Sequence, residues 1–354
     1  MGLFDRFYYG KAGQRDYTEA NMPKDRFSLF LLVLKDHLFD LAKVNFLQLI
    51  FWIPFIVWSY INLAALQGIG ADEEMELAEI AQQLYGFITM WLIGLIPCIA
   101  ITGPSSAGAA YVMRNWARDQ HAFLWSDFKD AFKANWKHAL GVSTITAFIP
   151  LIVYTAVTFY AQMTKEFALL FIPLGIVLML LILYTLMLPL LYPLMVGYEL
   201  SFKNIYRNAL LIASASLPIM ILSRLITFIP IALLFVGIFT GNAILIMIMS
   251  LYYVFFGFAF SRLVYASFAN GLFDKYLNPK IEGAPIGQGL RPADYEDEDD
   301  IDDEDDEEEE TQENRRDARP SGSRGMLHRL SEAIGTRSDA DKDDDDDEDD
   351  DDDV

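Results

Sequence analysis

The sequence is poor in the residues that most often carry chemistry. It has one cysteine, Cys98, and four scattered histidines in 354 residues. A single cysteine excludes an intramolecular disulfide and a cysteine-based metal cluster, and the histidines show no ligand spacing. The sequence also lacks a Gly-rich phosphate loop, an H-E-x-x-H motif and a nucleophile–base pair. We therefore expect no catalytic residue, no metal site and no cofactor.

The net charge of −22 comes from one end of the chain. Residues 294–354 hold 31 Asp and Glu against 7 Lys and Arg, a net charge of −24, whereas residues 1–293 have a net charge of +2. Runs of like charge with few apolar residues repel one another and stay unfolded, so we predict a disordered acidic tail. Within it, residues 326–334 have apolar side chains at helical spacing, and we weigh an unstructured tether against a helix that docks on a partner or on lipid.

The rest of the chain is too apolar for a soluble domain. Hydrophobic residues make up 53% of the sequence, and several charge-free runs exceed the roughly 20 residues that cross a bilayer. We predict an all-α, polytopic transmembrane helix bundle of about six spans, with five as the competing count. The expected spans are residues 44–66, 84–103, 139–164, 167–198, 209–237 and 243–265. The expected domains are a cytoplasmic N-terminal segment with an amphipathic helix (1–43), a transmembrane helical domain (44–270) and a cytoplasmic, mostly disordered acidic tail (271–354).

Basic residues alternate between the loops. They precede the first span, fill residues 114–138 and 203–207, and follow the sixth span, where we count Arg262 among them. The loop at 72–79 has five acidic residues and no basic one. The positive-inside rule therefore predicts that both termini are cytoplasmic. Charges throughout the first 43 residues argue against a removable signal peptide.

One nine-residue pattern occurs twice. Residues 132–140 and 202–210 share F-K-x-x-[WY]-[KR]-x-A-L, and each copy precedes or enters an expected span. Aromatic and cationic side chains of this kind suit the interface, where the cation meets anionic lipid headgroups. We favour such anchors over a duplicated unit that docks a partner, and the repeat suggests that spans three–four and five–six are related hairpins.

A series of blocks between residues 30 and 225 resembles the YesL-like family of bacterial integral membrane proteins. The blocks are Leu41–Leu47 (L-A-K-V-N-F-L), Gly103–Gly108 (G-P-S-S-A-G), Arg114-Asn115-Trp116, the aromatic positions Phe128, Phe132 and Trp136, and Leu191–Ala209. Their order carries the resemblance, since each block alone is weak. About 55 residues separate the first two blocks here, and the acidic tail is not part of the family pattern. The resemblance implies a domain of unknown function, in accessory proteins associated with carbohydrate uptake, and no reaction.

Gly103, Pro104, Ser105 and Ser106 form the first candidate functional or packing site. Proline lacks a backbone donor and disfavours helical geometry before it, so we expect a helix break with Ser105 and Ser106 as caps of a helix starting near Ala107. Small residues let another helix approach closely, and a helix N-terminus at membrane depth is a potential anion site. Kinked, tight helix packing is the interpretation that we favour.

Arg224 is the second candidate, because it is the only charge between Arg207 and Arg262. A cation at the centre of a span costs roughly 2.5–3.5 kcal/mol on insertion scales, so it needs a partner or a wet cavity. We consider Glu199, the carbonyls of proline-kinked helices, and Tyr or Asn side chains as partners. Arg114 and Trp116 are further candidates, with surface ion pairs and lipid contacts as the simpler interpretation.

These features predict a non-enzymatic protein of the bacterial plasma membrane. Its expected role is an accessory or scaffold component associated with carbohydrate uptake or envelope physiology. The alternative is a small permease with a cavity near Arg224 and the Gly103-Pro104 break. Expected partners are the bilayer with its anionic headgroups and either a transporter complex or further copies of the chain, and we expect no nucleic acid. A cavity lined by polar residues would favour the permease, and a fully packed bundle with an apolar flank would favour the accessory component.

Overall fold

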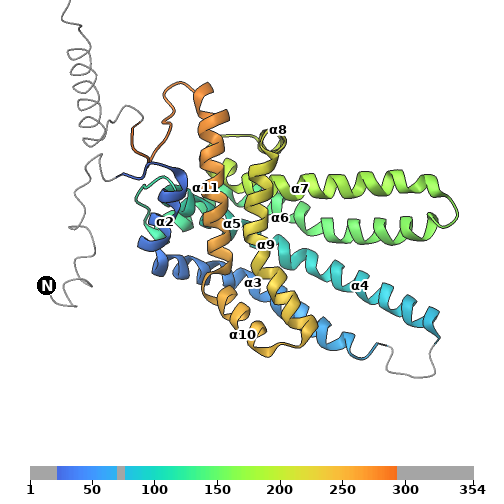
Figure 1. The fold of residues 1–354 in the computed structure, drawn as a ribbon. Helices are drawn as coiled ribbons and strands as arrows, with labels where there is room; N and C mark the ends of the chain where they lie inside the picture. The colour runs from blue at the N-terminus through green and yellow to red at the C-terminus, as the bar shows by residue number, and fades with distance from the viewer. Residues whose placement is uncertain (1–21, 70–75, 293–354) are drawn as a thin grey trace, which may run out of the picture. The chain divides into compact units, whose positions relative to one another are not determined.

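A computed structural model describes residues 22–69 and 76–292 of the chain (Figure 1). These residues are almost entirely helical and contain no strand, so the predicted all-α class is confirmed for them. The acidic tail predicted from residue 294 onward, its apolar segment 326–334 and most of the acidic loop near residue 72 lie outside the described residues.

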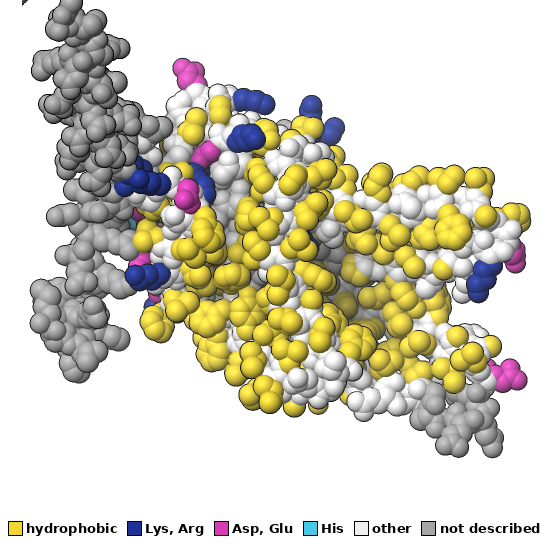
Figure 2. All heavy atoms as spheres, in the orientation of Figure 1, with side chains coloured by type: hydrophobic (Ala, Val, Ile, Leu, Met, Phe, Trp, Pro, Cys, Tyr) yellow, Lys and Arg dark blue, Asp and Glu magenta, His cyan; other side chains and the backbone are white. Residues whose placement is uncertain are grey.

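Within the described residues, six helical segments are long and apolar enough to cross a membrane, as predicted. They are α3 (Leu38–Leu66), α4 (Leu77–Ala100), α6 (Leu124–Met163), α7 (Phe171–Gly197), α9 (Leu217–Thr240) and the run of α10 (Ala243–Tyr252) and α11 (Phe258–Tyr276). In the most apolar window of each segment only 6–17% of the residues are buried. Apolar side chains therefore cover much of the face seen in Figure 2, as expected for a multi-pass protein whose solvent is lipid.

Several boundaries differ from the sequence prediction, mainly because charged residues next to an apolar run belong to the same helix. α3 begins at Leu38 and α6 at Leu124, well before the charge-free part of each run. The expected fifth span, 209–237, is divided at Ser216 into α8 (Phe202–Ala215) and α9. Pro218 explains this division, since a proline at the second position of a new helix costs no hydrogen bond.

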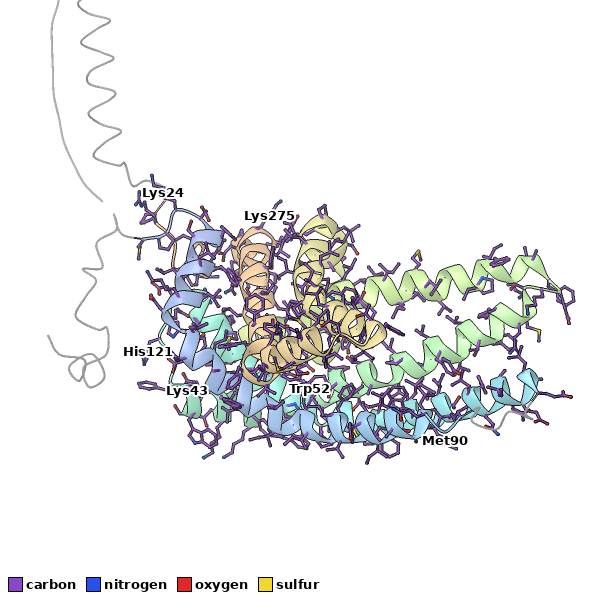
Figure 3. All side chains as sticks on the ribbon, turned by 60° about the horizontal axis from the view of Figure 1, so that its bottom comes forward. Lys24, Lys43, Trp52, Met90, His121 and Lys275 are labelled. Atoms are coloured by element: carbon purple, nitrogen blue, oxygen red, sulfur yellow. The ribbon has the colours of Figure 1, made fainter. Side chains whose placement is uncertain are left out.

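The basic flanks lie toward one end of the bundle. Lys24, Lys43 and His121 are at the end away from Met90 of α4 (Figure 3). The short helix α2 (Arg26–Asp36) begins at this end and is capped by Asp25, whose carboxylate accepts from the backbone N–H of Ser28 at 2.8 Å. This end therefore carries Lys24 and Lys43, two of the basic residues that precede the first span in the sequence.

α5 (Thr102–Trp116) is the most buried helix of the bundle, with 13 of its 15 residues buried. Its small side chains explain this, because they let α6 approach to backbone contact. A Cβ atom on Gly103 would lie 2.3 Å from the carbonyl oxygen of Ala139, and one on Gly108 would lie 2.7 Å from that of Phe128. α5 and α6 consequently form the most extensive helix–helix contact among the described residues.

The two copies of the repeated pattern meet in the core. Ala139 and Ala209, the equivalent alanines, are both fully buried in one apolar cluster with Ile205. Phe202 of the second copy packs on Gly141, directly after the first copy. The pattern thus includes core positions besides the interfacial side chains.

A π-helical turn, residues Tyr253–Gly257, joins α10 to α11. Such a turn frees backbone groups from their regular partners, and Asn45 of α3 binds four of them. Its Nδ2 donates to the carbonyls of Tyr253 and Val254 at 3.0 and 2.7 Å, and its Oδ1 accepts from the backbone N–H groups of Phe258 and Ala259 at 2.9 and 3.1 Å. Asn45 is fully buried, so one amide fixes this irregular turn.

Candidate functional site

A cavity of about 720 Å³ lies between α3, α4, α5, α6, α7, α9, the π-helical turn and α11. Its walls are mainly apolar and aromatic, with Trp52, Phe228 and Phe258 among them. Two arginines line it, Arg224 of α9 and Arg262 of α11, and no Asp or Glu is among its lining residues. A binding site of this volume accepts an organic molecule rather than a bare ion alone.

Arg224 faces the interior of the bundle, and a tyrosine holds it. Its Nη1 donates to Oη of Tyr265 at 2.6 Å, and the same oxygen lies 2.9 Å from Oγ1 of Thr227. Of the partners considered from the sequence, a tyrosine hydroxyl is the one found. Glu199 does not line the cavity, because it is exposed in the turn that follows α7.

Arg262 is the second cation of the cavity, which corrects its assignment to the cytoplasmic flank. The last helical segment extends to Lys280 rather than ending near 265, so Arg262 lies several turns inside it. Its Nη2 donates to Oγ of Ser106 at 2.7 Å, and its guanidinium carbon lies 4.5 Å from the centre of the Tyr192 ring. Arg262 and Tyr265 are one helical turn apart on α11, which places the two guanidinium groups beside the same wall.

The Gly103–Ser106 segment does not line this cavity itself, but it adjoins two lining residues, Thr102 in sequence and Arg262 through Ser106. α5 begins at Thr102 instead of near Ala107, and Pro104 is its third residue, where a missing N–H costs nothing. Ser105 and Ser106 therefore do not cap the helix. Each donates its hydroxyl proton to the carbonyl of Thr102 at 2.9 Å, and Ser106 also accepts from Arg262. The break and Arg224 thus meet at one cavity through Thr102 and Arg262.

The hydroxyl groups of the cavity wall have little donor capacity left. All six serine and threonine residues of the wall donate to backbone carbonyls within 3.1 Å: Thr102, Ser143, Thr146, Thr185, Thr227 and Ser261. Gln48 differs, because its side chain is 1% exposed and its Nε2 has no hydrogen-bond partner. Besides the ring N–H and hydroxyl groups of Trp52, Tyr192, Tyr253 and Tyr265, the donors that remain for a ligand are therefore the two guanidinium groups and this amide.

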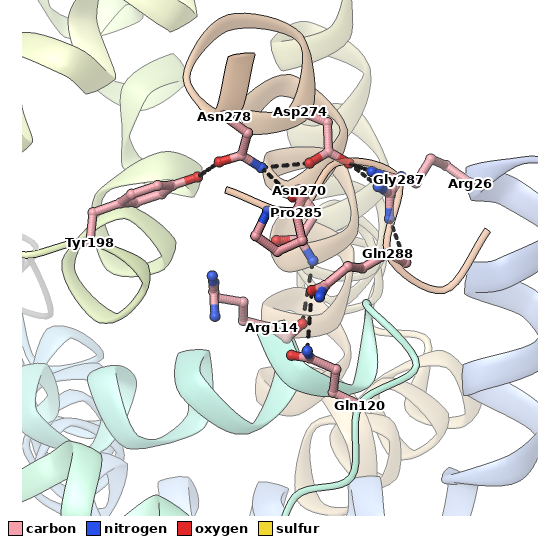
Figure 4. Close-up of polar contacts among 10 residues, drawn as sticks. All are labelled: Arg26, Arg114, Gln120, Tyr198, Asn270, Asp274, Asn278, Pro285, Gly287 and Gln288. Carbon is pink, nitrogen blue, oxygen red and sulfur yellow. Dashed lines mark hydrogen bonds and ion pairs between the residues drawn. The ribbon is translucent and has the colours of Figure 1, made fainter. Parts of the chain in front are cut away.

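A second arginine cluster lies where α5, α11 and the segment after α11 meet (Figure 4). Here the carboxylate of Asp274 binds Arg26 and accepts from the backbone N–H of Gly287 and the amide of Asn278. Asn278 in turn accepts from the Tyr198 hydroxyl at 2.6 Å. We name this set (Arg26, Arg114, Tyr198, Asn270, Asp274 and Asn278) the Asp274 network.

Arg114 and Trp116 belong to this buried region rather than to the surface. Nε of Arg114 is buried and has no hydrogen-bond partner. It packs against Gly197, and a Cβ atom on Gly197 would lie 2.8 Å from this Nε. Burial lowers the pKa of Arg114, Arg118 lowers it further, and Tyr198 and Asp274 oppose them. Trp116 is 2% exposed and stacks on His37 with ring centres 4.4 Å apart, so the expected lipid contact is wrong for it.

Sequence reasoning missed Arg262, Tyr265 and Gln48 as parts of one site. The spacing of Arg262 and Tyr265 on a helix was a usable signal, because residues three apart share a face. Gln48 follows Asn45 by one turn, so the block Leu41–Leu47 marks the helix face that meets the π-helical turn.

Residues 80–157 match the model of a family described as a protein of unknown function, DUF624. The matched stretch runs from α4 through α5 into α6 and includes Thr102, Ser106, Ser143 and Thr146. It is consistent with the YesL-like resemblance, although no related protein supplies that name. No curated protein and no solved structure matches the chain.

Proposed function

We propose that this multi-pass membrane protein binds an anionic solute among its membrane-spanning helices and acts as a small permease. The observation that supports this proposal is the pair of arginines, Arg224 and Arg262, in a cavity whose lining has no carboxylate. Guanidinium groups stay charged under all ordinary conditions. Buried charge at membrane depth is costly and is retained mainly where it serves a ligand or a relay.

The cavity favours the permease over the accessory or scaffold role. The accessory role in carbohydrate uptake or envelope physiology is supported by the family resemblance alone. A fully packed bundle would have favoured it, whereas eight elements here line a cavity that is mainly apolar but holds two arginines and several hydroxyl groups. The proposal involves no catalytic step.

Binding is tested with two probes of one shape. Benzoate and benzamide differ in charge but hardly in size, and a ligand that binds the folded state raises its melting temperature. We expect benzoate to stabilise the full-length protein in detergent and benzamide to have little effect. The preference should disappear when Arg224→Gln and Arg262→Gln are combined, and persist in Lys203→Gln, which removes an exposed cation at the start of α8. Equal responses to both probes would contradict anion binding.

Transport is tested separately in proteoliposomes with radiolabelled phenyl sulfate, an anion that does not cross the bilayer as a neutral acid. Uptake that depends on both arginines supports the permease. Binding without uptake would favour the accessory role, and co-purification from mild detergent would then identify the proteins that it accompanies.

We further propose that the protein lies in the bacterial plasma membrane with both termini cytoplasmic, as the Lys and Arg distribution favours. In a Cys98→Ser background, a cysteine at Glu79 should react with a membrane-impermeant reagent in intact cells, and a cysteine at Lys129 should not. The opposite pattern would invert the orientation.

A further inference from the structure

The amount of charge in the cavity, and not only its positive sign, restricts the charge of the ligand. Arg224 and Arg262 give the lining a charge of +2, and none of its residues offsets either charge. In surroundings of low dielectric constant, like charges repel strongly and each unneutralised ion pays a desolvation cost. A monoanion leaves one of the two cations uncompensated, whereas a dianion makes the occupied cavity neutral.

The arrangement of donors points the same way. Each arginine has five N–H donors, and in each only one is held by a neighbouring hydroxyl, of Tyr265 for Arg224 and of Ser106 for Arg262. Tetrahedral phosphate and paired carboxylates offer several acceptor oxygens, which match two planar guanidinium forks. The six serine and threonine hydroxyls of the wall already donate their protons to backbone carbonyls, so they contribute few hydrogen bonds to the oxygens of a ligand.

Gln48 supplies a further donor of a different kind. It is buried, it lines the same cavity, and its Nε2 lacks a partner. A buried amide nitrogen without a hydrogen bond costs free energy that a ligand oxygen would recover. The volume of about 720 Å³ and the aromatic side chains Trp52, Tyr192 and Phe258 leave room for an organic body next to the acid group.

We propose that the ligand is an organic dianion, whose charge is neutralised by Arg224 and Arg262 together and one of whose oxygens accepts a hydrogen bond from Gln48. This inference rests on the proposed anion binding and specifies its substrate class. Gln48 is on this account a specificity residue, because it keeps the wall uncharged at a position where glutamate would have the same shape.

The test compares phenyl phosphate with phenyl sulfate on the full-length protein in detergent at pH 8. The two esters have the same tetrahedral shape, but the phosphate is a dianion above its second pKa of about 6 and the sulfate is a monoanion. Titration calorimetry should give phenyl phosphate about ten-fold or more tighter binding. Sulfate binding as tightly as phosphate would overturn the dianion while leaving anion binding intact, and failure of both esters to bind would overturn both proposals.

Two variants assign the preference to the cavity. Gln48→Glu adds a carboxylate without changing the shape of the side chain, so it should weaken phosphate more than sulfate and reduce their ratio toward one. Arg262→Gln should reduce the ratio in the same way, and Lys203→Gln should leave it unchanged. A ratio that survives both cavity variants would place the dianion elsewhere and overturn the assignment.

A phosphate of this kind can come from a soluble ester or from a lipid headgroup. Nanodiscs with and without phosphatidic acid, which carries a phosphate monoester, separate the two sources. Competition of phosphatidic acid with phenyl phosphate identifies the ligand as a lipid, and unchanged binding of phenyl phosphate identifies it as soluble.

Discussion

The two arginine clusters of this protein differ in what surrounds the cations. In the Asp274 network a carboxylate binds Arg26, and a backbone N–H and an amide complete its contacts. In the cavity two arginines have hydroxyl and aromatic neighbours and no carboxylate on the lining. An arginine that is neutralised within the fold stabilises it, whereas one without an acidic partner remains able to bind an external anion. The two clusters should therefore respond differently to loss of charge.

The largest effect on stability is expected at the wall of the cavity rather than at its charges. Asn45→Leu removes an amide that serves four backbone groups of the π-helical turn, and those groups would have no replacement in an apolar environment. We expect a loss of about 3 kcal/mol in unfolding free energy and loss of anion binding. Thermal unfolding in detergent measures this loss. Asn135→Leu is the control, since that amide donates to the carbonyl of Ala131, one turn earlier on its own helix. Equal effects of the two changes would show that the π-helical turn does not depend on the Asn45 amide.

The next largest effect is expected in the Asp274 network. Asp274→Asn removes the charge that pairs with Arg26, whose side chain is 23% exposed. Because both partners retain some access to water, we expect a loss of about 2 kcal/mol, less than for a fully buried pair. Melting temperatures of this variant and of Asp130→Asn, which removes an exposed carboxylate, measure the difference. A variant as stable as the wild type would remove the contrast between the clusters.

A smaller change of the opposite sign is expected for Arg224→Leu. Leucine removes the cost of holding a cation without an acidic partner, so stability should stay the same or increase by about 1 kcal/mol. Binding of phenyl phosphate should nevertheless weaken, because only Arg262 then remains to balance its two negative charges. A marked decrease in melting temperature, with Arg207→Leu neutral, would instead show that Arg224 is a structural tie through Tyr265.

Much of this contrast follows from properties that a sequence displays, and part of it does not. Length and apolarity of the runs predict six spans, because crossing a bilayer sets a minimum helix length. Proline and glycine positions predict breaks but not which residue starts the next helix, so α5 begins five residues before the expected start. The rarity of charge in a span singled out Arg224. Arg262 was missed because a helix end inferred from flanking charges ignores how far the helix continues into the basic region.

The partner of an intramembrane arginine also depends on tertiary packing. Glu199 is a candidate partner of Arg224 from the sequence because it is the closest acidic residue along the chain. In the structure, however, it lies in the exposed turn that follows α7. Tyr265 is 41 residues away in sequence and reaches Arg224 only because α11 packs beside α9. Spacing within one helix is readable from sequence, and the pairing of distant helices is not.

The smallest effect is expected at His37, at the junction of α2 and α3. Burial against Trp116 lowers the pKa of His37, and the carboxylates of Asp40 and Asp36 oppose this shift. The folded protein therefore binds this proton more weakly than the unfolded chain, in which histidine titrates near about 6.5. Its contribution to stability is fully present above that value and is lost as the pH falls from there toward the lower folded pKa.

Because the side chain of His37 is 34% exposed, the loss of stability should be small. His37→Phe keeps the ring stack and cannot titrate, so the fall in melting temperature between pH 8 and pH 5 should be smaller in this variant than in the wild type. An equal fall in both proteins would assign the pH dependence to other groups. Arg224→Leu is the control, and we expect its melting temperature to fall as much as that of the wild type, because Arg224 does not contact His37.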